Sequence, residues 1–448
     1  MKRTLIAAIV AGFGATAAQA GALYFDFNSN LAGSSTTASL FLFGDAGQTA
    51  TVSNLAGFNQ TVTLDSNGFY NLGISNTYQQ SGTGIRNTGF EVASSDAIAG
   101  YFINRASATT DMTYLLDAQA LGKEYVVASQ GQGFGEGSQI QVHAIEDNTV
   151  ITLTPKGGGP VNVTLAKGET YKYAGGSVDL TGSTISSTKN VAVFSGHECA
   201  QVPAGVTYCD TLIEQAISTD KLSKNYLLTA SKGADLAYSH SDLVRVVGTA
   251  DNTQVKVDGV VVATINRGQA YEFSLAAGGG SKVEASEVVA VAQYLKGGQG
   301  ALTDPAMAYV PGQDTWLDAY RLATPSGSAA FDLNYASVVI SDADLTSLML
   351  NGVAVDTSGF SSITGTGFSR GIVNLGLGLF DLKADSAFLV MLGGGSAADS
   401  YFTYGGSTFA PGISPPPPPN GVPEPGSLLL TLGALGALAG VWRRRRTV

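Results

Sequence analysis

The sequence predicts an all-β protein of tandem β-sandwich-like repeats of about 95–100 residues, with an N-terminal signal helix and a single C-terminal transmembrane helix. Of its 448 residues, 44% are hydrophobic and 13% are charged, so the chain can fold into several packed domains. Its 57 glycines, and the Ser/Thr-rich stretches between apolar runs, favour many short strands joined by tight turns. The body also repeats itself, and the spacing gives the length of one repeat.

The first twenty residues have the order of a secretory signal peptide. Lys2 and Arg3 precede an apolar run over 5–13, and small residues follow up to the Ala18-Gln19-Ala20 end. This combination is typical of a signal peptide rather than of a buried N-terminal helix. We therefore expect export of the chain and cleavage after Ala20.

Three segments of the body align on a tyrosine. Tyr125 opens YVVAS, Tyr226 opens YLLTAS and Tyr320 opens YRLATPS, at offsets of 101 and 94 residues. Each segment precedes a strand, a turn and a second strand, and each unit closes on an apolar strand such as VAVFSG at 191–196. A degenerate copy is expected over about 39–104.

Each unit offers about seven short runs of strand character, which suits a β-sandwich. A propeller blade needs only four strands in about 40–50 residues, so it fits the spacing less well. The predicted parts are 1–20, a signal peptide; 21–105, a degenerate first repeat; 106–200, a second repeat; 201–300, a third repeat with a disulfide linker; 301–410, a fourth repeat; 411–422, a proline-rich spacer; and 423–448, a C-terminal sorting and membrane segment.

Two repeated motifs admit a structural and a functional interpretation. The Asp-Asn-Thr turns at 147–149 and 251–253 are expected to act as turn chemistry, because Asx residues tolerate the left-handed region. Calcium binding is the alternative, although each turn supplies few oxygens. The aromatic pairs Tyr171/Tyr173 and Tyr271/Phe273 alternate as on a strand and are expected to face a core. As a sugar platform they would have to be exposed in a row.

The C-terminal region combines a proline tract with an apolar span. Residues 414–419 predict an extended spacer, and the 17-residue stretch 426–442 can just cross a bilayer. Four arginines follow directly, namely Arg443, Arg444, Arg445 and Arg446. They are expected to stay in the cytoplasm, which places the body outside. A permanent anchor that pairs through Gly436 and Gly440 is the alternative to a transient one.

This C-terminus resembles the PEP-CTERM sorting signal. The pattern is a Pro-Glu-Pro box at Pro423, Glu424 and Pro425, then a hydrophobic helix, then a basic tail. The resemblance implies recognition and processing by an exosortase, and delivery to the surface or extracellular matrix of a Gram-negative bacterium. Until processing, the helix would hold the protein in the membrane.

The two cysteines of the chain fall in one linker. Cys199 and Cys209 are separated by nine residues, and an exported chain meets an oxidising compartment. We expect them to form a structural disulfide, which contributes about 3 kcal/mol through the entropy of the unfolded chain.

The sequence around the cysteines resembles the N-terminal domain family of IgGFc-binding proteins, over about 101–393. The matching motifs are LGKEY at 121–125, DNT at 147–149, the strand at 191–196, CxxVP at 199–203, CDxLxEQ at 209–215 and KNY at 224–226. The resemblance implies an extracellular adhesive or matrix role. It does not carry antibody Fc recognition to this chain, because that property names one animal member. The additional cysteines often found in the family are absent here.

No motif predicts catalysis or cofactor binding. Glycines 131, 133, 135 and 137 could suggest a phosphate cradle, but the segment after them alternates as a strand, so we predict a flexible loop. His197-Glu198 starts like a zincin motif, but its fifth residue is Gln201. A triad of Ser195, His197 and Asp210 lacks the GxSxG elbow that would present the serine. We expect His197 to be a structural residue at a strand end.

The remaining histidines, His143 and His240, are far apart in the chain, so no metal site and no cofactor are predicted. With 35 acidic and 24 basic residues, the chain is not expected to bind nucleic acid. We predict a non-enzymatic exported structural or adhesion protein of the cell surface or extracellular matrix. Its expected partners are an exosortase, the secretion machinery, and extracellular polysaccharide or other surface proteins. A carbohydrate-binding surface module and a secreted polysaccharide-active enzyme are the alternatives.

Overall fold

A computed structural model describes residues 21–31, 38–106, 108–237, 239–298, 303–327 and 330–412. Strands make up 58% of the structure and helical residues 6%, which confirms the all-β prediction. Within the described ranges, every helix is too short or too polar for a bilayer crossing. The predicted signal peptide with its cleavage site at Ala20, the proline tract, the Pro-Glu-Pro box, the apolar span and the arginine cluster lie outside the described residues.

The strands form four similar two-sheet repeats within one compact unit that ends at Ser414. In repeat 1, one sheet has the order β1-β7-β3-β4 and the other β5-β2-β8-β9. Its strands are β1 (Gly21–Phe25), β2 (Ala38–Phe43), β3 (Thr49–Asn54), β4 (Asn59–Thr63), β5 (Phe69–Ile74), β7 (Phe90–Ser94), β8 (Ala99–Ala106) and β9 (Thr109–Tyr114), with a 3-10 helix η1 (Asn76–Tyr78). A short strand of this region, β6 (Gly84–Arg86), pairs instead with β14 (Thr170–Gly176) of repeat 2.

In repeats 2 to 4, one long strand belongs to both sheets. The strands of repeat 2 are β10 (Gly122–Val126), β11 (Gly133–Ala144), β12 (Thr149–Thr154), β13 (Val161–Leu165), β14, β15 (Thr184–Ala200) and β16 (Asp210–Gln215). The first half of β15 pairs with β10 and β12, and its second half pairs with β11 and β16. In repeat 1 the same strand is interrupted, as β7 and β8.

Repeats 3 and 4 follow this plan with the long strands β22 and β30. Repeat 3 contains β17 (Ser223–Thr229), β18 (Ser241–Gly248), β19 (Thr253–Val257), β20 (Val260–Ile265), β21 (Ala270–Ala276), β22 (Gly280–Leu295) and β23 (Ala306–Tyr309), with η2 (Thr219–Lys221) and α1 (Lys232–Leu236). Repeat 4 contains β24 (Leu317–Thr324), β25 (Leu333–Ser341), β26 (Met349–Leu350), β27 (Val353–Ala354), β28 (Ser361–Ile363), β29 (Phe368–Leu375), β30 (Gly378–Ser396) and β31 (Asp399–Tyr404), with η3 (Gln313–Thr315) and η5 (Asp342–Ser347).

The three aligned tyrosines occupy the same environment. Each hydroxyl donates to a carbonyl of the long strand and accepts the N–H of the residue three positions before the tyrosine. Tyr125 bonds to the carbonyl of Val191 and the N–H of Gly122. Tyr226 bonds to the carbonyl of Val289 and the N–H of Ser223. Tyr320 bonds to the carbonyl of Phe388 and the N–H of Leu317. The hydroxyl thereby ties the start of each repeat to its long strand.

The Asp-Asn-Thr residues stabilise turns, as predicted. Asn148 and Asn252 adopt the left-handed region, with φ of 54° and 56°. The aspartates bond to a second turn of the same repeat, since Asp147 Oδ1 accepts the N–H of Lys167 and Asp251 Oδ1 accepts that of Arg267. The motif thus pins two neighbouring hairpin turns together.

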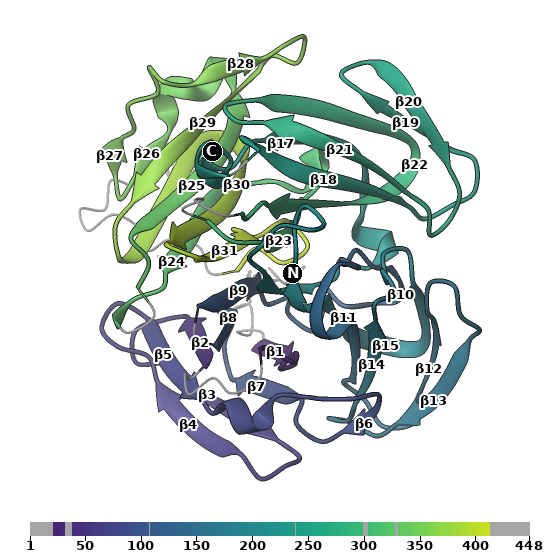
Figure 1. Ribbon diagram of the computed structural model, residues 1–448. Helices are drawn as coiled ribbons and strands as arrows, with labels where there is room; N and C mark the ends of the chain where they lie inside the picture. The colour runs from purple at the N-terminus through teal and green to yellow at the C-terminus, as the bar shows by residue number, and fades with distance from the viewer. Residues whose placement is uncertain are drawn as a thin grey trace, which may run out of the picture. The chain divides into compact units, whose positions relative to one another are not determined.

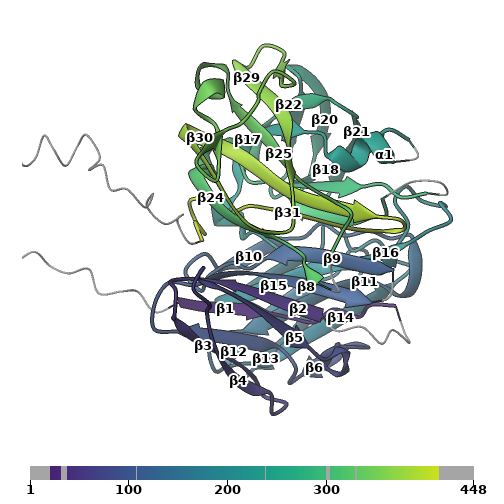
Figure 2. The same ribbon diagram turned by 90° about the vertical axis from the view of Figure 1, so that its left-hand side faces the viewer.

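The four repeats pack around a shared centre, which is formed by the last strand of each. These strands are β9, β16, β23 and β31, and they contact one another. Figure 1 shows the repeats arranged around this centre, and Figure 2 shows β9, β16 and β31 between the two halves of the unit. The second halves of the long strands are buried throughout because neighbouring repeats cover them, whereas the first halves alternate between buried and exposed residues.

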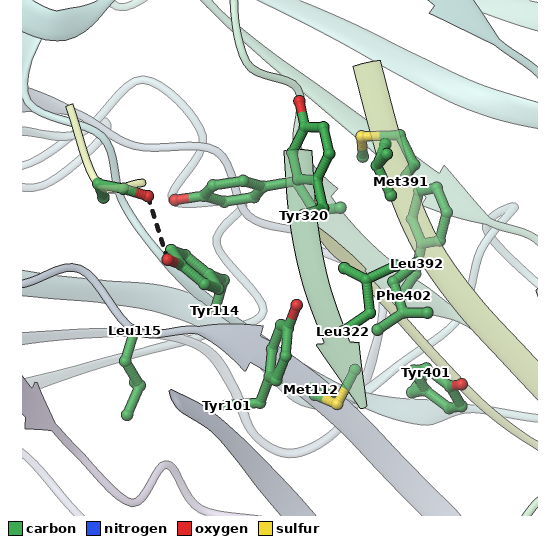
Figure 3. Packing of buried hydrophobic residues seen from close by; sticks show 14 of the residues in the cluster. Tyr101, Met112, Tyr114, Leu115, Tyr320, Leu322, Met391, Leu392, Tyr401 and Phe402 are labelled. Carbon is green, nitrogen blue, oxygen red and sulfur yellow. Dashed lines mark hydrogen bonds between the residues drawn. The ribbon is translucent and has the colours of Figure 1, made fainter. Parts of the chain in front are cut away.

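Asp111 lies at this centre with no exposed surface. Its carboxylate accepts one backbone N–H from each repeat, and each donor is the third residue from the end of its last strand. The donors are Met112 at 2.9 Å, Ile213 at 3.1 Å, Met307 at 3.1 Å and Phe402 at 3.2 Å. Burial raises the pKa of Asp111 well above its usual value, and the four N–H donors oppose this shift. Met112 and Phe402, two of the residues that donate these N–H groups, belong to the apolar cluster of Figure 3, which also contains Leu322 and Met391.

A second set of carboxyl groups lies at another level of the same centre. Asp210, Asp304 and Asp399 each stand five residues before the end of their last strand, and Thr109 holds this position in repeat 1. All four residues are buried. Among the described residues, one oxygen of each aspartate has no hydrogen-bond partner. We call these three residues the aspartate ring.

Candidate functional site

The disulfide predicted from the sequence is present. Cys199 and Cys209 join the end of β15 to the start of β16, with a Cα–Cα distance of 5.1 Å. The bridge closes the loop between two paired strands. It therefore fixes the edge of repeat 2, in keeping with the predicted structural role.

The hypothetical triad does not form. Ser195 Oγ lies 3.2 Å from the hydroxyl of Tyr309, and His197 Nδ1 accepts the N–H of Cys199 at 3.0 Å. Burial lowers the pKa of His197 to about 4, so the imidazole is neutral and serves as an acceptor. Within the described ranges, no group of three or more His, Cys, Asp or Glu side chains is placed to hold a metal ion. His197 is thus a buried strand residue beside the disulfide.

The prediction of a flexible loop for the glycine ladder was wrong for Gly133, Gly135 and Gly137, which lie in β11, whereas Gly131 lies before the strand. Gly133 opens strand β11, where it pairs with Ala200, and Phe134 pairs with Cys199. Gly135 and Gly137 have φ of 71°, and the pairing with β15 shifts register between Phe134 and Ser138. The glycines therefore form an irregular, bulged strand end, because the partner strand supplies hydrogen bonds that local sequence does not reveal.

The aromatic pairs do not form an exposed platform. Tyr171 is buried, and Tyr173, Tyr271 and Phe273 are half-buried against the cores. The rings of Tyr271 and Phe273 stack at 6.0 Å. The predicted core role is confirmed in full for Tyr171 and in part for the other three.

The bulged end of β11 borders a cavity between repeats 1 and 2, which we call the polar groove. Its volume is about 430 Å³. The lining residues are Ser29, Asn30, Asn76, Gln79, Ser81, Gly135, Glu136 and Glu198. Apart from the glycine, every one has a polar side chain, and they come from both repeats.

Glu136 is fixed in the groove wall from three sides. Its Oε2 lies 2.7 Å from Lys172 Nζ and accepts a hydrogen bond from Ser29 Oγ, and its Oε1 accepts the N–H of Gly82 at 2.6 Å. Burial alone would raise the pKa of Glu136, but the ion pair with Lys172 lowers it below its usual value. Burial lowers the pKa of Lys172, and Glu136 opposes that shift. The lysine side chain has no exposed surface, so its charge is paired with Glu136 inside the groove wall and does not face the groove.

Glu198 faces the same groove from strand β15. Its Oε2 accepts the backbone N–H of Glu136 at 2.6 Å. Gly135 leaves the room for this carboxylate, because a Cβ at position 135 would lie 2.3 Å from Glu198 Cδ. Burial raises the pKa of Glu198, and the nearby charge of Glu136 raises it further.

Sequence reasoning missed this groove. Lys172 stands between two tyrosines in an alternating strand, a pattern that predicts an exposed lysine, and it is buried because the segment after β1 covers that face of β14. Glu136 and Glu198 are 62 residues apart in sequence. The glycine at 135 was the available signal, since glycine in a strand often marks a close approach.

Fold and groove together define an all-β repeat protein with a polar groove and, among its described residues, no metal centre or triad. The chain belongs to the IgGFc binding protein family, which matches residues 111–394. It is 26% identical over 302 residues to the human IgGFc-binding protein. That match covers 62% of this chain and 5% of the human protein, so the chain spans a small part of its relative. The family resemblance seen in the sequence is confirmed, and the family is one of binding proteins.

Proposed function

We propose that this chain is an exported, non-enzymatic protein of the cell surface or extracellular matrix that works by binding. The observation that carries this proposal is the state of the carboxylates in the polar groove. Glu136 is held by Lys172 and Gly82, and Glu198 by the N–H of Glu136. The ion pair of Glu136 with Lys172 keeps this carboxylate charged, which supports recognition over proton transfer at this residue.

Two further observations support an extracellular location. The Cys199–Cys209 disulfide is typical of proteins that fold in an oxidising compartment. The four repeats share one centre and form a single compact unit, which suits a body that must keep its shape outside the cell. Delivery by a signal peptide and processing by an exosortase at the Pro-Glu-Pro box are part of this proposal, as is a Gram-negative envelope as destination.

Of the alternatives, carbohydrate binding is favoured by the groove, because its lining is polar and partly accessible. A polysaccharide-active enzyme would need two carboxylates in one cleft, and the groove does contain Glu136 and Glu198. The ion pair of Glu136 with a buried lysine speaks against that role. Binding of antibody Fc belongs to the name of the human protein, and we do not propose it here.

The proposal is tested by fractionating a bacterium that carries the gene. We expect the full chain in the membrane fraction of an exosortase-deleted strain and a shorter form outside cells of the parent strain. Deleting the gene should weaken cell–cell adhesion or retention of the matrix. Retention of the protein in the cytoplasm, or hydrolysis of extracellular polysaccharide by the purified chain, would overturn the proposal.

A further inference from the structure

The chemistry of the polar groove limits what it can bind. With Gly135 its lining consists of three amide side chains, two hydroxyls and two carboxylates. An apolar ligand would find no apolar side chain in this lining and would leave the polar groups unpaired. The volume of 430 Å³ lies in the range of pockets for small organic ligands. The occupant must therefore be polar over most of its surface.

The charge of the groove argues against anions. Two carboxylates face it, Lys172 is buried and paired with Glu136, and the guanidinium of Arg86 is engaged with the carbonyl of Ser81. The whole chain also has a formal net charge of −11. Phosphate, sulfate or uronate groups would meet electrostatic repulsion at this site. Among the described residues, no group of three or more His, Cys, Asp or Glu side chains is placed to hold a metal ion, so nothing in the groove points to a divalent cation.

The groove offers acceptors in fixed positions together with a donor in need of a partner. Glu136 and Glu198 are held by hydrogen bonds, so their orientation is set before a ligand arrives. Gln79 is half-buried at the border, and its Nε2 has no hydrogen-bond partner within the described part of the chain. That nitrogen is closed to solvent, so it reaches a ligand only when the side chain turns into the groove. A hydroxyl group both donates and accepts, so neighbouring hydroxyls on one molecule match this arrangement.

An exposed aromatic residue lies next to the groove residue Gly135 along β11, outside the lining itself. Phe134 precedes Gly135 in β11, pairs with Cys199 next to Glu198, and keeps 55% of its surface exposed. An aromatic ring can cover the apolar C–H face of a sugar, whereas the carboxylates take the hydroxyl edge. From these observations we propose that the polar groove binds a neutral carbohydrate, with Glu198, Glu136 and Gln79 bonding adjacent hydroxyls. The proposal deepens the function proposed above, on which it rests.

The first test is binding of the purified full chain to neutral hexose oligomers of glucose, mannose and galactose, measured by calorimetry. Glu198→Gln keeps the shape of the side chain and removes its charge. We expect binding about tenfold weaker, in line with loss of a charged hydrogen bond. Glu287→Gln, an exposed glutamate of repeat 3, is the matched control and should bind as the wild type does.

The second test separates binding from a structural role. Gln79→Leu removes a donor that has no protein partner in the described structure, so unfolding in urea should be unchanged while sugar binding weakens. Gln254→Leu, at an exposed position of β19, is its control. Full binding in both Gln79→Leu and Glu198→Gln would overturn the proposal. So would binding that requires calcium, or a preference for polygalacturonate over neutral oligomers.

The outcomes also separate this proposal from the broader one. If the wild-type chain binds none of the hexose oligomers but its deletion still weakens adhesion, the groove assignment fails and the binding function stands. If deletion leaves adhesion unchanged while the groove variants lose sugar binding, the adhesive function fails and the groove assignment stands.

Discussion

The centre of the protein buries carboxyl groups in two contrasting ways. Asp111 receives four backbone N–H donors, one from each repeat. The aspartate ring has an unpartnered oxygen on each of Asp210, Asp304 and Asp399, within the described residues. An aspartate thus joins the repeats by hydrogen bonds at one level. At the other level, buried aspartates with unpaired oxygens oppose the packing of the repeats. The difference shows that donors, and not burial alone, decide whether a buried carboxyl group stabilises a fold.

The electrostatics of the two levels differ accordingly. Burial, followed by the charge of Asp399, raises the pKa of Asp304 to about 7. Burial likewise raises the pKa of Asp399 to about 7, opposed by Thr110 and Arg105. Burial and the charges of the other two aspartates raise the pKa of Asp210 well above its usual value. In the ring these groups are therefore protonated in mildly acidic solution.

The largest effect is expected from removing the acceptor at the centre. Asp111→Ala leaves four buried N–H groups without a partner, and each costs about 1–3 kcal/mol. We expect the free energy of unfolding to fall by at least about 4 kcal/mol, measured in urea at pH 7. Asp111→Asn should also destabilise, because its amide N–H₂ would face N–H donors. A loss below about 1 kcal/mol for both variants would contradict the central role of Asp111.

The next effect is a dependence of stability on pH. The folded pKa values of Asp304 and Asp399 lie above the unfolded value, so the folded state binds more protons between about pH 4 and pH 7. Stability from these groups is present below pH 4 and is lost as the pH rises through about 7. We expect a loss of at least about 3 kcal/mol between pH 4 and pH 8 in urea unfolding. The double variant Asp304→Asn/Asp399→Asn should flatten this profile.

A smaller effect should follow from completing the ring. Thr109 is the repeat 1 residue at the ring position, and Thr109→Asp adds a fourth carboxyl group there. Thr109→Asn is the control, since it has nearly the same shape and no charge. At pH 8 the aspartate variant should be less stable than the asparagine variant by about 1–3 kcal/mol, and the gap should close at pH 4. Equal stability at both pH values would argue against contact between the ring carboxyls.

The smallest effect is the gain from neutralising one ring member. Asp304→Asn should raise the melting temperature at pH 8 by a few degrees, equivalent to about 1 kcal/mol, and change it little at pH 4. Glu287→Gln on the surface serves as the control for loss of one negative charge. Destabilisation by Asp304→Asn at pH 8 would mean that the carboxylate has a partner essential to the fold.

The sequence allowed the repeat to be recognised because its signals are local. The tyrosine three residues after its N–H partner recurs in repeats 2, 3 and 4, and the Asx turn with a left-handed asparagine recurs in repeats 2 and 3, as the repetition suggests. The two cysteines were also paired correctly. Asp111, by contrast, sits in the segment TTDMTY, which has no feature of its own. Three of its four donors lie about one, two and three repeats further along the chain, so the centre could not be predicted.

The candidate groove could not be predicted for a related reason. It combines the segment after β1 and the segment around η1 with β11 and β15, and its residues meet only when repeat 1 packs against repeat 2. Lys172 shows the limit clearly, because alternation along one strand cannot tell whether a neighbouring repeat covers that face. Packing between repeats buries the charged Lys172 at a position where the local pattern predicts an exposed residue.

The number of repeats that this centre can hold is set by one side chain. A carboxylate has about four lone-pair sites, and four backbone amides fill them. An open solenoid gains or loses a unit at its end with modest cost. Here the backbone N–H of a fifth copy would find no free lone pair on Asp111. Loss of one copy would leave one lone pair of this buried carboxylate without a hydrogen bond. Duplication of a single unit should therefore be poorly tolerated, and relatives should vary in their loops and tails before they vary in copy number.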